Sequence, residues 1–343
     1  MQTFDPKNTP VHGGGLNAAA TRYSIPLGDW LDLSTGINPN GWSVPQIPTT
    51  IFSRLPENDD KLLAAARAYY GVDNILPIAG SQAAIQFLPQ LKGQSCVGVI
   101  NPGYQEHAHC WSKAGHKVKL ISIEDIEKNI GQLDVLILIN PNNPTGEVFT
   151  IEQVLRWHQI LSDKIGWLII DEAFMDSTPS KSFLSLSKKH GFIVLRSLGK
   201  FFGLAGLRVG FVAAEKDLIN NLSHLLGPWA ISHPSRYVAI QALNDINWQN
   251  ETRKALSQQS RKLTDTLTQC GLTPQGGTDL YQWLTIKNAR NWYEQLAQQG
   301  LLVRYFEHSD SLRFGLPKNN NEYLRLKQGL KKAKQNLQEL NHA

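Results

Sequence analysis

The 343-residue sequence predicts an α/β protein with a mostly parallel sheet flanked by helices and a smaller α+β domain. From about residue 60, helical patterns alternate with short apolar runs that end at turn residues. The runs at 96–100, 134–139 and 167–171 are largely apolar on successive residues, as expected for strands covered on both faces. The length and an apolar fraction of 41% are consistent with one large domain and a smaller one.

The large domain, expected over residues 46–248, is predicted to begin with two helices. The segment 60–71 (DKLLAAARAYYG) has the pattern of a helix that ends at Gly71, and a second helix is predicted over 81–91 (SQAAIQFLPQL), just after Gly80. Helices dominate again beyond about residue 215. Between these helical regions lie the strand candidates, residues 96–100, 117–121, 134–139, 167–171 and 192–195.

The smaller domain is expected to combine the N-terminal segment 1–45 with residues 249–343. The first 45 residues are rich in Gly, Pro and Asn and show no pattern of a helix or strand, so we expect them to lie across the body of the protein or a partner subunit. The elements expected in the C-terminal part are an amphipathic helix over about 249–270, a strand at 281–287, a helix at 289–300, strands at 301–306 and 311–316, and a closing helix.

The charge pattern does not indicate a nucleic-acid or membrane partner. The formal net charge is +5, but the basic residues are spread along the chain, and the run at 325–334 is expected on the solvated face of the last helix. No apolar stretch reaches the length of a transmembrane helix, and the first ten residues lack the pattern of a signal peptide. We therefore expect a cytoplasmic protein.

Cysteines and histidines do not form the pattern of a metal site. Cys96, Cys110 and Cys270 are too few and too scattered for a disulfide framework or a zinc site, so we interpret them as reduced thiols. Three histidines that lie close together in the sequence are predicted to pack or cap within a helix after Tyr104 and not to bind a metal; they are His107, His109 and His116.

Polar residues follow the apolar strands at several points. The motifs NPGY, NPNNPTG, DEAF and SLGK follow the strands near 100, 139, 170 and 195, and AGSQ precedes a helix. Because the carboxyl ends of the strands in an open α/β sheet line one crevice, we expect these five loops to converge there.

These residues suit one cofactor, pyridoxal 5'-phosphate. The amine of Lys200 can form a Schiff base with its aldehyde, and a carboxylate such as Asp171 keeps the pyridine nitrogen protonated so that the ring accepts electrons. Asn143 can donate to the ring oxygen, and Tyr104 is placed to stack on the ring face. The phosphate requires N–H groups at a helix start, hydroxyls and a guanidinium; the candidates are Gly80, Ser81, Gln82, Ser197 and Arg208. Each motif alone is also compatible with ordinary turn or cap chemistry.

The motifs NPNNPTG, DEAF and SLGKFFGLAGLRVGF, followed by LRFG near the end, together resemble the aspartate-aminotransferase-like, fold-type I, class I/II family of pyridoxal-phosphate enzymes. The resemblance spans nearly the whole chain. It implies Lys200 as the Schiff-base lysine, Asp171 at the pyridine nitrogen, Asn143 at the ring oxygen and Arg313 at the substrate carboxylate. It also implies a homodimer with sites at the subunit interface.

Within this family, the segment VHGGGLNAAATRYSIPLGDWLDLSTGINPNG is most similar to the start of decarboxylases of cobalamin biosynthesis, which act on a small phosphorylated amino acid. That resemblance implies that His12 and Asn38 reach the substrate, and that Asn143 lies beside both substrate and cofactor. It places Arg304 on the strand preceding the one that carries Arg313. Besides Arg313 at the carboxylate, a second anchor on the substrate phosphate would fix how the substrate is rotated. This orientation selects between decarboxylation and transamination.

Three positions depart from the family pattern. Gly199 stands where relatives have Ser or Thr, Phe174 where aminotransferases commonly have Tyr, and Leu55 where a related motif offers a Tyr to the phosphate of the neighbouring subunit. The second departure agrees with a decarboxylase. Two alternatives stay open: a histidinol-phosphate-type aminotransferase, which shares nearly every cofactor residue, and the effector-binding part of a transcription regulator. The latter would need an appended helix-turn-helix domain, for which this sequence has no room.

Overall fold

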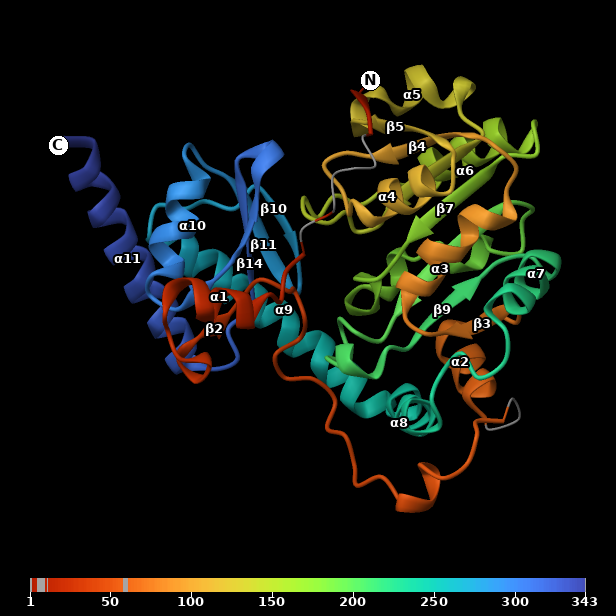
Figure 1. The fold of residues 1–343 in the computed structure, drawn as a ribbon, viewed down its shortest axis with the longest axis horizontal. Coiled ribbons are helices and arrows are strands. Elements are labelled where there is room, and N and C mark those ends of the chain that lie inside the picture. Colours follow the sequence, from red (N-terminus) through yellow and green to blue (C-terminus); the bar gives the residue numbers. More distant parts are fainter. Residues whose placement is uncertain (1, 5–9, 11, 58–60, 343) are drawn as a thin grey trace. The chain divides into compact units, whose positions relative to one another are not determined.

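The computed structural model describes residues 2–4, 10, 12–57 and 61–342 of the chain (Figure 1). The chain divides into two compact units. The first, here called the large unit, contains Met1–Pro10, Gly41–Asn143 and Glu147–Glu251. The second, the small unit, contains Val11–Asn40, Pro144–Gly146 and Thr252–Ala343.

The large unit is built on an eight-stranded sheet of order β1-β5-β4-β6-β7-β8-β9-β3 (Figure 1). The neighbours from β5 to β8 are parallel, whereas β1, β9 and β3 pair antiparallel to their neighbours. The strands are β1 (Gln2–Thr3), β3 (Ile75–Ile78), β4 (Cys96–Ile100), β5 (Lys117–Ile121), β6 (Val135–Ile139), β7 (Trp167–Asp171), β8 (Phe192–Ser197) and β9 (Gly210–Ala213).

Helices cover both faces of this sheet. Alternate side chains of β6, β7 and β8 form a core cluster with α3, α4 and α7; they include Val135, Ile137, Ile169 and Ile193. The intervening side chains, such as Leu136, Ile170 and Val194, are buried as well, and α6 packs on β7. The helices of this unit are α2 (Leu62–Tyr70), α3 (Ser81–Phe87), α4 (Glu106–Lys113), α5 (Ile126–Asn129), α6 (Ile151–Ser162), α7 (Lys216–Leu226) and α8 (His233–Asn244).

The predicted ends of several elements agree with the structure. Helix α2 ends at Tyr70, and the expected Gly71 caps it with the left-handed φ of 68° that glycine adopts readily. Strands β4 and β5 have the expected bounds. Strand β3 was missed because Pro77 interrupts its pattern; proline is tolerated there since β3 lies at the edge of the sheet.

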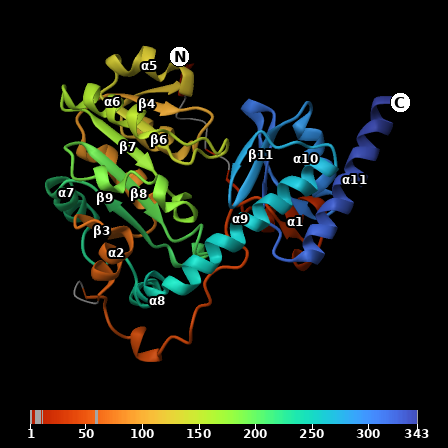
Figure 2. The same cartoon turned by 180° about the vertical axis from the view of Figure 1, so that it is seen from behind.

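The small unit contains an antiparallel sheet of order β10-β11-β14-β13 and a two-stranded parallel sheet of β2 and β12. Helices α10 and α11 contact each other (Figure 2). Helix α10 also packs against β12, β13 and β14. The elements are α1 (Leu16–Tyr23), β2 (Leu31–Asp32), β10 (Gly276–Thr278), β11 (Tyr281–Thr285), α10 (Ala289–Ala297), β12 (Leu301–Leu302), β13 (Arg304–Phe306), β14 (Ser311–Gly315) and α11 (Asn320–His342). Helix α9 (Ile246–Gln269) begins in the large unit and continues into the small one.

The expectation that the first 45 residues form no element is wrong. Residues 16–23 form α1, in which Ala19 packs with Trp30, Ala297 and Leu302, and β2 pairs with β12. The helix is short and its alanines give weak periodicity, so tertiary packing rather than a sequence pattern stabilises it. The pairing of β2 joins segments about 270 residues apart and has no local signal in the sequence.

None of the described helices is long and apolar enough to cross a membrane.

Candidate active site

The predicted cofactor residues of the large unit lie at the carboxyl ends of its parallel strands. Asp171 is the last residue of β7 and Ser197 the last of β8, with Lys200 three residues further on. Asn143 and Tyr104 follow β6 and β4 in the same way. Because β4, β6, β7 and β8 are parallel neighbours, their carboxyl ends share one edge of the sheet. The structure therefore brings these loops to one edge.

Asp171 is a buried carboxylate held by two donors. Its Oδ1 accepts a hydrogen bond of 3.0 Å from the Ala173 N–H. Its Oδ2 lies 3.0 Å from Nε2 of His107, a buried residue in the first turn of α4. An ionised carboxylate only accepts hydrogen bonds, so His107 Nε2 must carry the hydrogen when Asp171 is charged. The geometry suits a carboxylate that keeps its charge away from water, as a protonated ring nitrogen would require.

Lys200 lies beside an aromatic ring. Its Nζ is 5.2 Å from the ring centre of Phe174, which is itself buried. Phe174, which stands where aminotransferases commonly have Tyr, therefore faces the lysine with a ring face and offers it no hydroxyl. The local packing explains why residue 199 is a glycine. A Cβ there would lie 3.2 Å from the Ala205 Cα, which is tighter than an ordinary contact, and 3.4 Å from the Ser197 Oγ.

A second group of residues forms a cradle for an anion around Gly80. Gly80 has a φ of 75°, which favours glycine, and a Cβ there would lie 2.7 Å from Nη2 of Arg208, so a larger residue would displace the guanidinium. A Cβ at Gly210 would lie 2.6 Å from the Ser81 backbone nitrogen. Ser197, the last residue of β8, accepts a hydrogen bond of 3.2 Å on its Oγ from the Gly199 N–H. N–H groups, a hydroxyl and a guanidinium are the donors that a phosphate requires. The large unit thus fits the phosphate of the expected cofactor.

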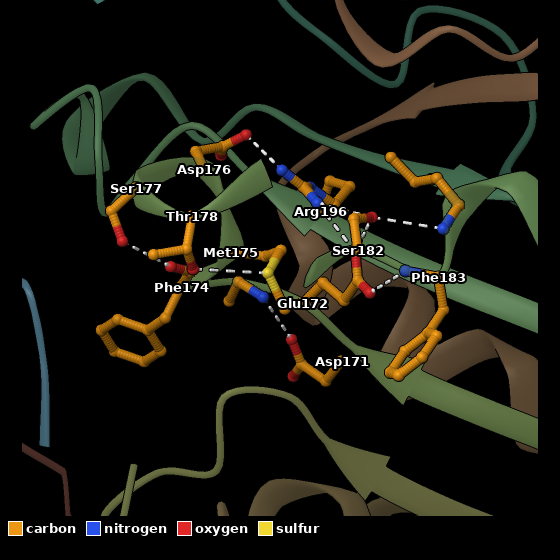
Figure 3. Close-up of polar contacts among 12 residues, drawn as sticks. Asp171, Glu172, Phe174, Met175, Asp176, Ser177, Thr178, Ser182, Phe183 and Arg196 are labelled. Atoms are coloured by element: carbon orange, nitrogen blue, oxygen red, sulfur yellow. Dashed lines mark hydrogen bonds and ion pairs between the residues drawn. The ribbon is translucent and has the colours of Figure 1, made fainter. Parts of the chain in front are cut away.

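Behind Asp171 lies a buried charge network centred on Arg196, shown in Figure 3. Nη1 of Arg196 donates to Glu172 Oε2 at 2.7 Å, and Nη2 donates to Asp176. Glu172 also accepts hydrogen bonds from Ser182 Oγ at 2.5 Å and from the Phe183 N–H at 2.7 Å. Burial raises the pKa of Glu172, and the Arg196 charge opposes that shift.

This network fixes the residues next to two cofactor candidates. Glu172 directly follows Asp171, and Arg196 directly precedes Ser197. Arg196 therefore ties the end of β7 to the end of β8, and it holds both ends of the loop that carries Phe174 (Figure 3).

Apart from Asn143, the predicted substrate residues lie in the small unit, where two arginines stand opposite each other. Arg304 of β13 pairs with Arg313 of β14 in the antiparallel ladder. Arg313 is buried and its Nη2 donates to the Ser34 carbonyl oxygen at 2.6 Å. Burial lowers the pKa of Arg313 to about 10, which leaves the guanidinium charged at neutral pH, and burial also lowers the pKa of Arg304. Two neighbouring arginines, Arg313 buried and Arg304 half-buried, form an attractive site for anions.

The other two substrate candidates differ in exposure. Asn38 is buried and its Oδ1 accepts a hydrogen bond of 2.9 Å from the Asn40 N–H, whereas His12 is exposed. Their contact with a substrate stays a prediction. Among the described residues, no group of three or more His, Cys, Asp or Glu side chains could hold a metal ion.

Residues 50–326 match the family of class I and II aminotransferases. The chain belongs to this family. A threonine-phosphate decarboxylase of Pseudomonas aeruginosa is 49% identical over 315 residues, covering 92% of this chain and 95% of that protein. Another of that name from a Sinorhizobium species is 35% identical, with 89% and 93% covered. A histidinol-phosphate aminotransferase of Buchnera aphidicola is 29% identical, with 76% and 78% covered.

The fold is also that of solved aminotransferases. Histidinol-phosphate aminotransferase from Sinorhizobium meliloti, solved in complex with pyridoxal-5'-phosphate, superimposes with a TM-score of 0.84 over 96% of both chains at 17% identity. The fold-type I α/β architecture predicted from the sequence is confirmed.

His107, Glu172 and Arg196 form hydrogen bonds and ion pairs that were not predicted from the sequence. His107 was expected to pack or cap in a helix; it lies in α4 and is buried, but it also bonds Asp171. Its spacing of three residues after Tyr104, in the first turn of a helix, was the available signal. Glu172 and Arg196 each adjoin a named residue, yet nothing in the sequence shows that β7 and β8 place them together.

Proposed function

We propose that this chain is a pyridoxal-phosphate-dependent enzyme that decarboxylates L-threonine O-3-phosphate to (R)-1-amino-2-propanol O-2-phosphate, for cobalamin biosynthesis. The observation that carries this proposal is the pair Arg304 and Arg313, because two neighbouring arginines, one half-buried and one buried, suit a substrate with a carboxylate at one end and a phosphate at the other. The 49% identity with a threonine-phosphate decarboxylase over 92% of the chain supports the same substrate.

The large unit has the groups that the cofactor needs. Lys200 would hold it covalently through its aldehyde, Asp171 would keep the pyridine nitrogen protonated, and Asn143 would donate to the ring oxygen. The cradle of Gly80, Ser81, Gln82, Ser197 and Arg208 would hold its phosphate, and Tyr104 would stack on the ring. When bound, pyridoxal phosphate supplies an electron sink for the negative charge left on Cα by the departing CO₂.

In this proposal, residues of the small unit hold the substrate and so select decarboxylation over transamination. Arg313 binds the substrate carboxylate, while Arg304, with His12 and Asn38, binds the substrate phosphate. Holding both anionic ends fixes the rotation about the bond from Cα to nitrogen, so that the bond to the carboxylate is the one presented for cleavage. The amino group of Lys200, released when the substrate amine takes its place on the cofactor, would then donate a proton to Cα in the position that CO₂ leaves.

One assay separates this activity from that of a histidinol-phosphate aminotransferase. Released CO₂ and accumulated pyridoxamine phosphate are measured with threonine phosphate, and then with histidinol phosphate plus 2-oxoglutarate. We expect CO₂ from the first substrate with little pyridoxamine phosphate. Transamination of histidinol phosphate without CO₂ release from threonine phosphate would overturn the decarboxylase and establish the aminotransferase.

The proposed enzyme is a homodimer that works in the cytoplasm. Three large apolar side chains of the large unit, Phe52, Leu55 and Trp229, are each at least 60% exposed. All three line one hollow of about 400 Å³, which gives a second copy of the chain an apolar surface to cover. Light scattering should therefore show a dimer that Trp229→Asp weakens; a monomeric wild-type protein at micromolar concentration would contradict it.

A further inference from the structure

Four side chains beside the cofactor cradle form a chain of hydrogen bonds with a fixed direction. Tyr104 Oη lies 3.3 Å from Oε1 of Gln82, whose Nε2 lies 2.7 Å from Oε2 of Glu106. The thiol of Cys110, one helical turn after Glu106, donates to the same carboxylate oxygen at 3.9 Å. Gln82 comes from α3, and Glu106 and Cys110 from α4, the helix packed beside it.

The chemistry of Glu106 decides the direction. An ionised carboxylate accepts hydrogen bonds and donates none, so the nitrogen of the Gln82 amide must face it. The amide oxygen of Gln82 then faces Tyr104 and can only accept. Tyr104 must therefore donate its hydroxyl hydrogen to Gln82. The orientation of an amide group is often ambiguous, but an acceptor on one side removes that ambiguity here.

The electrostatics agree with this direction. Burial raises the pKa of Tyr104, and the Glu106 charge raises it further, so the phenol keeps the hydrogen that it donates. Burial and Glu106 also raise the pKa of the Cys110 thiol, to about 11, so the thiol remains a donor to the carboxylate at neutral pH. His107 stands edge-on to the Tyr104 ring, with ring centres 6.2 Å apart, and limits the ring from another side.

We infer that Glu106 is a positioning residue for the cofactor site: it orients the Gln82 amide, and through Gln82 it fixes the Tyr104 hydroxyl as a donor and the Tyr104 ring in one orientation. The inference deepens the proposed function and rests on it, since Tyr104 is there the residue that stacks on the cofactor. In this hydrogen-bond chain Glu106 contacts Gln82 and not Tyr104, so it acts on Tyr104 only through Gln82.

A purely structural role for Glu106 makes a different prediction. A negative charge in the first turn of α4 also favours the helix dipole, and loss of that charge would lower stability without involving Gln82. The decisive variant is therefore Glu106→Gln, tested in the wild-type chain and in a chain that carries Gln82→Ala. The matched control is Glu127→Gln, which makes the same change at a carboxylate on α5 that accepts from Arg156 and from Trp157 Nε1.

The first measurement uses the protein without cofactor. In a chain with ¹³Cζ-labelled tyrosine, the Tyr104 resonance is assigned by its loss in Tyr104→Phe. We expect Glu106→Gln to move this resonance, because a glutamine at 106 accepts either orientation of the Gln82 amide. In the Gln82→Ala chain the same substitution should leave it in place, and Glu127→Gln should leave it in place in both. An unmoved resonance, or an equal movement without Gln82, would overturn the inference.

The second measurement is the dissociation constant of pyridoxal phosphate. We expect Glu106→Gln to raise it about three- to tenfold, the effect of one ordinary hydrogen bond, and to have no effect in the Gln82→Ala chain. Equal effects in both chains would make Glu106 structural and overturn the inference. If the wild-type chain binds no pyridoxal phosphate while the tyrosine resonance responds as expected, the proposed function fails but the hydrogen-bond chain stands.

Discussion

His107 Nε2 lies 3.0 Å from Asp171 Oδ2, and both side chains are almost fully removed from water. The pair joins the first turn of α4 to the end of β7, two strands away from the β4 strand that leads into this helix. The other carboxylate oxygen of Asp171 accepts a hydrogen bond from the Ala173 N–H, so both oxygens have a partner. The relationship makes Asp171 the residue best suited to hold a proton on the cofactor ring.

We therefore expect Asp171→Asn to lower turnover by several orders of magnitude while pyridoxal phosphate still binds. The substitution keeps the shape of the side chain but removes the charge that stabilises the protonated ring in the transition state. Steady-state CO₂ release and the visible absorption of the purified protein measure the two quantities. Near-normal turnover would rule out this role for Asp171.

Lys200 is expected to carry the cofactor covalently. Borohydride treatment of the yellow wild-type protein should fix one pyridoxyl group on the peptide that contains Lys200, and Lys200→Ala should abolish this adduct. Mass spectrometry of the digested protein locates the group. Phe174, whose ring centre is 5.2 Å from the Lys200 Nζ, gives a control: Phe174→Tyr should keep the adduct. An adduct that persists on another residue in Lys200→Ala would exclude this assignment.

The Arg196 network should contribute strongly to stability. Arg196→Met leaves the carboxylates of Glu172 and Asp176 buried without their shared cation, and breaking a buried pair in this way costs about 3–5 kcal/mol. Arg156→Met removes an exposed ion pair with Glu127 and should cost about 0–1 kcal/mol. Urea denaturation gives both values. Equal losses for the two variants would show that the buried network does not stabilise the fold more than a surface pair.

The thiol of Cys110 gives a pH dependence. Its pKa is raised by burial, and by Glu106, from 9.0 to about 11. The unfolded chain loses this proton near the lower value and the folded chain near the higher one, so between them the folded state binds more protons. The thiol's contribution to stability is therefore complete below about pH 9 and is lost as the pH rises toward 11. Cys110→Ser should flatten the fall in urea midpoint over this window; an unchanged slope would contradict the shift.

Much of the large unit, and the position of its cofactor candidates at one edge of the sheet, was predictable because the signal is local. Apolar runs covered on both faces mark β4, β6 and β7, and the parallel topology then brings their end loops to one edge. Asp171 and Lys200 could thus be named from spacing and family motifs alone.

The remaining features depend on contacts between distant segments. Helix α1 and strand β2 are held by residues near 300, and the bonds of His107 and Arg196 require neighbours on other strands. The donor and acceptor roles in the hydrogen bonds from Tyr104 through Gln82 depend on which atom of the Gln82 amide faces Glu106. None of these relationships has a period or a motif in the sequence, since side-chain partners are set by tertiary packing.

The last prediction concerns Arg304, which stands opposite Arg313 in the small unit. If Arg304 binds the substrate phosphate, Arg304→Ala should lower kcat/KM for threonine phosphate by at least about tenfold, the loss expected for one charge-assisted contact. Activity toward unphosphorylated threonine should change much less, because that substrate offers no phosphate. Arg290→Ala, at an exposed position on α10 of the same unit, is the control for loss of positive charge and should leave both values unchanged. Equal losses with both substrates would instead assign Arg304 to the carboxylate end or to the packing around Arg313, and the two-anchor account of the reaction choice would then fail.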